Sequence, residues 1–437
     1  MTMQHPFTVD AARALGGPDW LRDRRVAAAE GLADVEWPTA EEEIWRYSRI
    51  DELELARFRP MSAEELGAPG VDSVPGGGPV AAEVGERAGL VVVRDGRVVH
   101  HELDPALAAR GVVVGGLATL DHASVAGTLG ATSDASPDAF TLLHDAFLAG
   151  GAYVHVPKGV VVDAPIVVLH WSDGDGLASF PHTLVVAEET SQVSVLERFG
   201  SPDVEHLVDA VVELIVRDGA NVRYQAVQEY GPRTWSVALQ RAHLGRDAVL
   251  RSSAVALGGA YARLRSEARL EAPGAESEQV AVYYGDQDQM LDFRTLQDHV
   301  APRTHSNLLF KGAVEDRARS VYSGLVHIHP EAQKSTATQS NRNLVLTEGA
   351  GAESIPNLEI EADDVRCSHA SAVGPIDEDQ RYYLATRGVP PEEAERLIVL
   401  GFFEDVFERL PVAALVGPLR RAVHDKLGHL HPGDGRG

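Results

Sequence analysis

The chain has 437 residues, of which 65 are acidic and 39 are basic, so its formal net charge is -26. A surface this acidic repels phosphate groups, and we therefore expect neither nucleic-acid binding nor attachment to an anionic membrane surface. The single cysteine excludes an internal disulfide and any metal site that needs two thiolates from this chain.

The first residues contain no basic region followed by an apolar run, which is the pattern of a secretion signal. The sequence also has no run of about 18 consecutive apolar residues, the length that a membrane-spanning helix needs. We therefore expect a cytoplasmic protein without a membrane span.

Residues 1–66 are predicted to form an N-terminal helical domain. Asp10 is a candidate cap for a first helix, and Pro18 is a candidate start for a second. A capping-box pattern that begins at Thr39 predicts a third helix, with Trp45 packed inside this unit.

Residues 67–88 are rich in Gly and Pro and are expected to be a linker. From 89 to 372 the apolar residues come in short runs or alternations of strand length, except for one helix expected from Ser136, its cap, to Ala149. So many strands without helical crossovers leave a sandwich, a barrel or a β-solenoid. Because hairpin signals are few and strands recur without a break, we predict a right-handed parallel β-helix core.

Residues 373–437 are predicted to form a C-terminal helical domain. Asp377 is a candidate cap of a short helix, and Pro391 opens a longer one that is expected to run to Leu410. The apolar residues of the longer helix cover more than one face. One face is therefore expected to pack on the domain's own core, and another is available to a partner.

The only cysteine, Cys367, lies two residues before His369, next to a strand-like alternating segment. In an extended chain residues i and i+2 face the same side, so the thiol and the imidazole would project side by side. Both are metal ligands, but two ligands do not complete a site. A buried cysteine beside a hydrogen-bonded histidine explains the pair as well.

His327 and His329 form a second candidate pair, because they alternate along one predicted strand and would face the same way. This is the spacing of a two-histidine metal site. Ordinary surface or core histidines, in a chain that also has His299 and His305 nearby, explain the pair equally well.

An ordered series of short segments runs through the second half of the chain. It comprises Asp292-Phe293-Arg294-Thr295, Thr304-His305-Ser306-Asn307, Tyr322-Ser323-Gly324, Gln339-Ser340-Asn341-Arg342-Asn343, Cys367-Ser368-His369 and Asp377-Glu378-Asp379-Gln380. In this order the segments resemble the SufB/SufD family, the scaffold proteins of the sulfur-mobilisation (SUF) system for iron-sulfur cluster assembly. The single cysteine and the N-terminal helices favour its D branch over its B branch. The family pattern has Gly where this chain has Ala370, which puts the local turn in doubt.

The resemblance implies a parallel β-helix between two helical domains, in a non-catalytic subunit of a SufBCD-type complex. It also implies a SufB paralogue paired through the β-helices, a SufC ATPase on the C-terminal helices and, for some members, reduced FAD. No Gly-rich loop ends in Gly-Lys-Ser/Thr, which agrees with ATP hydrolysis by another chain.

By the same resemblance, His369 would hold iron or a nascent iron-sulfur cluster jointly with a cysteine of SufB. Cys367 would be a further ligand or a sulfur acceptor, or else would be packed inside the coil. The residues expected to dock SufC, with self-packing as the alternative, are Leu397, Phe402, Phe403 and Phe407.

Two other functions stay open at this point. A free-standing β-helix enzyme acting on carbohydrate would carry acid, base or cation sites along a groove, but the absence of a secretion signal and the terminal helices count against it. A purely structural partner-binding protein is the other alternative.

Overall fold

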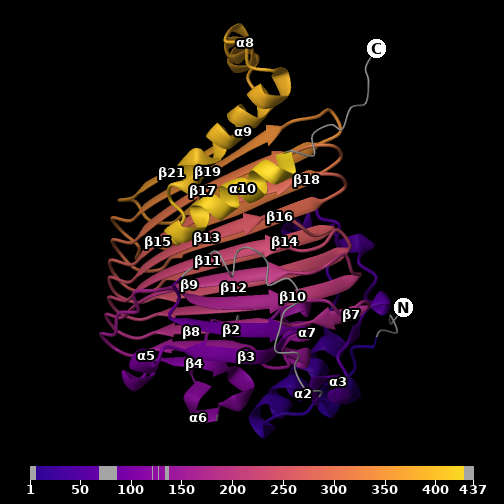
Figure 1. Ribbon diagram of the computed structural model, residues 1–437. Coiled ribbons are helices and arrows are strands. Elements are labelled where there is room, and N and C mark those ends of the chain that lie inside the picture. Colours follow the sequence, from indigo (N-terminus) through magenta and orange to yellow (C-terminus); the bar gives the residue numbers. More distant parts are fainter. Residues whose placement is uncertain (1–5, 68–85, 121, 126, 133–136, 428–437) are drawn as a thin grey trace.

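The computed structural model describes residues 6–67, 86–120, 122–125, 127–132 and 137–427. Strands fill the middle of the chain, and helices lie on both sides of them (Figure 1). The linker expected over 67–88 falls mostly outside the described residues. Among the described residues, no helix combines the length and the apolarity needed to cross a membrane.

Two large sheets make up the body of the protein, and the first is called sheet A here. Its main path, in spatial order, is β4 (Val113–Gly116), β5 (Ala152–Val156), β8 (His182–Ala187), β10 (His206–Val216), β12 (Thr234–Leu244), β14 (Tyr261–Leu270), β16 (Met290–His299), β18 (Arg319–Ile328) and β20 (Gly351–Ile360). The short strands β1 (Arg59–Pro60) and β7 (Leu177–Ser179) extend this sheet beside β10.

The second sheet, sheet B, takes the strands in between. In spatial order it contains β3 (Arg97–Leu103), β2 (Gly89–Arg94), β6 (Ile166–Trp171), β9 (Gln192–Gly200), β11 (Asn221–Glu229), β13 (Val249–Ala256), β15 (Glu276–Gly285), β17 (His305–Val314), β19 (Thr336–Val345) and β21 (Arg366–Gly374). The chain therefore alternates between the sheets from β8 onward.

This alternation makes a parallel β-solenoid, as predicted. Each strand pairs in parallel with the next strand of its own sheet, one coil later. The coils differ in length: a short one leads from Trp235 to its partner Tyr261, and a longer one leads from Arg319 to its partner Gly351. Because the coil length varies, the repeat cannot be found by counting along the sequence.

Alternate side chains of each strand point into the solenoid and stack in rows. One such row contains Val185, Leu214, Ala242 and Ala268, which are paired in register and almost fully buried. Burying one Val or Leu side chain contributes about 1.5–3 kcal/mol, so repetition of such rows stabilises the coil along its whole length.

The beginning of the solenoid terminates in antiparallel strands. β3 pairs antiparallel with β2, with a register shift between Val92 and Val93, and the short β4 pairs antiparallel with β5. α5 (Pro105–Ala109) and α6 (His122–Val125) lie at the same end (Figure 1). Short, bulged or covered edges of this kind resist pairing with further strands.

Most of the N-terminal elements pack on sheet A. The N-terminal elements are α1 (Val9–Ala14), α2 (Asp19–Asp34), the 3-10 turns η1 (Glu43–Trp45), η2 (Ile50–Glu52) and η3 (Leu55–Arg57), and α3 (Ala63–Gly67), with η4 (Leu117–Thr119) and α7 (Ala139–Phe147) from the region before β5. Trp45 and Phe58 belong to the same hydrophobic cluster as Leu207, Val237 and Tyr261, which lie on successive strands of this sheet.

Three local predictions for the helices before β5 are wrong. The hydroxyl of Thr8 accepts from Ala11 N at 3.2 Å and caps α1, in place of Asp10. Asp138 caps α7, in place of Ser136, which lies outside the described residues. The helix predicted around Trp45 is a single 3-10 turn. The indole ring of Trp45 lies 3.9 Å from the Arg263 guanidinium, so tertiary packing holds this residue in place of a longer helix.

The C-terminal elements are α8 (Glu378–Thr386), α9 (Pro391–Phe407), η5 (Ala413–Leu415) and α10 (Val416–Leu427). Asp377 caps α8 as predicted, whereas α9 ends at Phe407, before the predicted Leu410. α9 and α10 lie across sheet B, and α8 projects beyond the last coil (Figure 1). Buried Lys311 of β17 donates to Phe402 O at 2.7 Å and pairs with Asp405 at 2.7 Å, which ties α9 to the sheet.

Candidate functional site

The last coil of the solenoid is open. Among the described strands, β20 and β21 each have a neighbour on one side only. Arg366 N–H donates to Ser335 O at 3.1 Å. Because residues of a parallel strand alternate in the side to which they bond, the N–H groups of His369 and Ser371 point to the open edge. The end of the solenoid therefore offers unpaired backbone groups to another strand.

Cys367 and His369 lie on β21 at this open end. Cys367 is in register with Ala337 and packs against a small hydrophobic cluster that includes Val326. His369 is in register with Gln339 and is exposed. No hydrogen bond of its ring is found among the described residues, so the imidazole is free to accept a ligand.

The thiol of Cys367 is half-buried. Burial raises its pKa above the usual value, and a hydrogen bond from the backbone of Ala337 opposes this shift only in part. The neutral thiol is therefore favoured, whereas sulfur acceptance and metal binding both need the thiolate. In the isolated chain this environment suits the packed alternative better than the sulfur-accepting one.

A buried polar row reaches the open end beside His369. Gln339 Nε2 donates to Tyr322 Oη at 2.8 Å, and Tyr322 Oη lies 3.1 Å from Thr295 Oγ1. Within the described part of the chain, Gln339 Oε1 has no hydrogen-bond partner. Buried polar groups are usually hydrogen-bonded. The unpaired oxygen of Gln339 therefore shows that the polar row is not fully hydrogen-bonded where it reaches the last coil.

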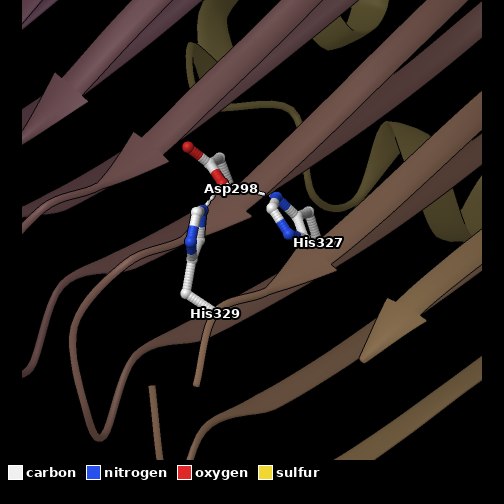
Figure 2. Close-up of side chains that lie close together, drawn as sticks. All are labelled: Asp298, His327 and His329. Atoms are coloured by element: carbon white, nitrogen blue, oxygen red, sulfur yellow. Dashed lines mark hydrogen bonds and ion pairs between the residues drawn. The ribbon is translucent and has the colours of Figure 1, made fainter. Parts of the chain in front are cut away.

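His327 and His329 converge on a third residue, Asp298 of β16 (Figure 2). His329 Nε2 lies 2.8 Å and His327 Nδ1 lies 3.2 Å from the same oxygen, Oδ1 of Asp298. The sequence pattern indicated the two histidines but not the aspartate. Asp298 lies one coil before His327 and comes opposite it only through the register of the coils.

The four residues expected to dock a partner differ in burial. Phe403 and Phe407 are fully buried in the chain's own hydrophobic core, and Phe402 is half-buried. Leu397 is 46% exposed, and on α8 Tyr382 is 73% exposed. The buried pair therefore stabilises the chain itself, and within the described C-terminal helices the exposed large apolar side chains lie on α8 and the adjoining part of α9.

The first family-like segment, around Asp292, has a structural role. Burial alone raises the pKa of Asp292, but the guanidinium groups of Arg263 and Arg294 lower it below the usual value. The same arginines donate to Ile44 O and Arg46 O, both at 2.7 Å. This buried ion group therefore fastens the N-terminal segment to sheet A.

Comparison with known proteins adds to this geometry. Residues 170–402, slightly more than half of the chain, match the family model described as "SUF system FeS cluster assembly, SufBD core domain". The chain is 31% identical over 426 residues to an iron-sulfur cluster assembly SufBD family protein of Mycobacterium tuberculosis, with 92% of this chain and 95% of that relative covered. It is 28% identical over 425 residues to the iron-sulfur cluster assembly protein SufD of Bacillus subtilis, with 94% of each chain covered.

Proposed function

Because this chain belongs to the SufBD family and has a role in SUF iron-sulfur cluster assembly, we propose that it is the non-catalytic scaffold subunit of a SufBCD-type complex. The resemblance drawn from its motifs is confirmed by the family match, and this role replaces the carbohydrate-enzyme alternative. In the proposed complex a SufB-type paralogue pairs with the solenoid, and a SufC-type ATPase docks on the C-terminal helices.

The observation that carries the proposal is the open last coil. An exposed strand edge readily pairs with a strand of another chain. At this end the sheets terminate in the long parallel strands β20 and β21, whereas at the other end they terminate in the short or bulged antiparallel strands β3 and β4. A paralogue that ends in the same kind of strands would continue one or both sheets across the interface.

His369 would then contribute one ligand for the cluster or iron that the complex assembles. A neutral imidazole is a suitable iron ligand, and a thiolate of the partner would supply what this chain lacks. Cys367 would become a further ligand only if metal binding displaced the proton of its thiol, because burial of this side chain favours the thiol over the thiolate. Reduced FAD remains an expectation that rests on the resemblance alone.

The ATPase would dock on α8 and Leu397. No residue of α8 is buried, and Arg381 on this helix pairs with Glu395 of α9 at 2.5 Å. α9 is in turn tied to β17 through Lys311. ATP-driven movement of the docked subunit would therefore pass along α8 and α9 to sheet B, and such a movement can open or close the end of the solenoid.

The test is to express the chain with SufB-type and SufC-type partners and to purify the complex without oxygen. Iron, sulfide and visible absorption are measured for the wild type, for His369→Ala and for the control His101→Ala, an exposed histidine on β3 at the other end of the solenoid. We expect all three to form the complex and only His369→Ala to lack the cluster. Equal iron and sulfide in His369→Ala would refute the site, and failure of the wild type to form a complex would refute the scaffold role.

A further inference from the structure

A second set of metal-ligand side chains lies on sheet A, apart from the last strand of sheet B that carries His369. Asp298 is on β16, His327 is on β18, and His329 directly follows β18 (Figure 2). The geometry points to a site in which these three side chains bind one divalent transition-metal ion, for example iron(II). Two histidines and one carboxylate that leave other coordination positions open are the donor set of non-haem iron(II) sites.

The distances fit a common ion. Two ligand atoms that each lie about 2.1 Å from an ion are about 3.0 Å apart at right angles and about 3.4 Å apart at the tetrahedral angle. Asp298 Oδ1 lies 2.8 Å from His329 Nε2 and 3.2 Å from His327 Nδ1. The two imidazole rings are 4.0 Å apart between centroids and are tilted by 45°. Small side-chain movements would therefore place an ion between the three atoms.

The carboxylate is already oriented for this role. Arg269 Nη1 binds the other oxygen of Asp298, Oδ2, at 2.6 Å, so Oδ1 is left facing the histidines. Asp298 and His327 are paired in register on neighbouring strands, and His327 is paired with Glu359 on the next. Ligands on rigid strands with a supporting partner lose little freedom when an ion binds.

The surrounding charge and exposure suit a cation. Glu361 lies 3.8 Å from His327 Nε2, and His327, Glu359 and Glu361 form a further group of potential ligands. The carboxylates of Asp298, Glu359 and Glu361 thus lie at this group, beside the guanidinium of Arg269. The side chains of His327 and His329 are 23% and 30% exposed, so an ion can enter and can keep water in its open positions.

This inference does not rest on the proposed scaffold function, because it concerns the isolated chain and a different strand from His369. Without an ion, His329 Nε2 donates a hydrogen bond to Asp298 Oδ1, and His327 Nδ1 lies 3.2 Å from the same oxygen. A metal titration separates these two states of the site.

The experiment treats the purified full chain with a chelator, removes the chelator, and adds Fe²⁺ without oxygen or Co²⁺ as a spectroscopic probe. Binding is measured by equilibrium dialysis and by the visible absorption of bound Co²⁺. We expect one ion per chain for the wild type and for the control His101→Ala. His329→Ala and His327→Ala should weaken binding at least tenfold while keeping the wild-type melting temperature, because both side chains are partly exposed.

Two outcomes would overturn the inference. One is binding by His329→Ala and His327→Ala that equals the wild type. The other is loss of the bound ion in His369→Ala but not in His329→Ala, which would assign the ion to the open end of the solenoid. Asp298→Asn should also weaken binding, but Asp298 is buried, so the conclusion depends on the two histidine variants.

Discussion

Replacing Phe403 by Ala should loosen α9 from sheet B. The side chain of Phe403 is fully buried and shares a hydrophobic cluster with Val282 and Leu309 of the sheet. Its ring also makes edge contacts with Phe402 and Phe407, at centroid distances of 5.2 and 6.2 Å. Removing a buried Phe side chain costs about 3–5 kcal/mol through lost burial and the cavity left behind.

The measurement is hydrogen exchange of the α9 amides. A repeat structure opens in parts, so a loss of about 3–5 kcal/mol should appear first where α9 detaches. Each 1.4 kcal/mol is a factor of about ten, so these amides should exchange about a hundred to several thousand times faster than in the wild type. Amides of β10, far from α9 in the sequence and on the other sheet, should be unchanged.

The matched control is Leu397→Ala on the same helix. Leu397 is 46% exposed, so its replacement should change exchange in α9 little, by about 0.5 kcal/mol or less. The same control should weaken binding of the SufC-type ATPase if the dock lies on this surface. Exchange rates of α9 that stay at the wild-type value in Phe403→Ala would refute the assignment of Phe403 to the chain's own core.

Two further predictions concern pH and pairing. His206 is buried and neutral, with Nδ1 2.7 Å from Gly174 O and Nε2 2.9 Å from Ser179 Oγ, and burial lowers its pKa from 6.5 to about 4. As the pH falls, the unfolded chain therefore binds a proton at His206 before the folded chain does, so about 3 kcal/mol of the free energy of unfolding should be lost from pH 6.5 to pH 4. Urea unfolding at both pH values should show a smaller loss for His206→Asn than for the wild type. An equal loss in the two proteins would contradict the argument. Ser371→Pro removes an N–H group that faces the open edge of β21, so the variant should keep the wild-type melting temperature. In a pull-down it should bind the SufB-type partner at least tenfold more weakly than the wild type does. The control Ser371→Ala keeps this N–H group and should bind the partner normally. Wild-type partner binding by Ser371→Pro would show that the β21 edge is not used.

The sequence predicted the solenoid because its signal is repeated in every coil. Runs of apolar residues recur through most of the chain, and one uncertain strand does not change the conclusion. Helix ends were predicted less well, because Thr8 and Asp10 are both good caps and only the folded chain decides between them. The turn at Trp45 depends on Arg263, which is distant in the sequence and which no local pattern reveals.

The candidate sites were also predicted from the sequence only in part. The pairing of His327 with His329 follows from the alternation of side chains in an extended chain, although His329 lies one residue beyond β18. Asp298 required the register between coils, and the varying length of the coils hides this register in the sequence. The apolar width of α9 was visible in the sequence, but its pattern did not reveal that Phe403 and Phe407 would be buried by the chain's own sheet.

The two ends of the solenoid differ, and this difference limits how far an assembly can grow. A coil with two open ends could add copies without limit and form a fibre. Here the first end terminates in short or bulged antiparallel strands, β3 beside β2 and β4 beside β5, which resist further pairing, whereas the other end terminates in the longer parallel strands β20 and β21. When two such chains join at β20 and β21, both remaining ends carry the short or bulged strands. The fold therefore disfavours the addition of a third chain.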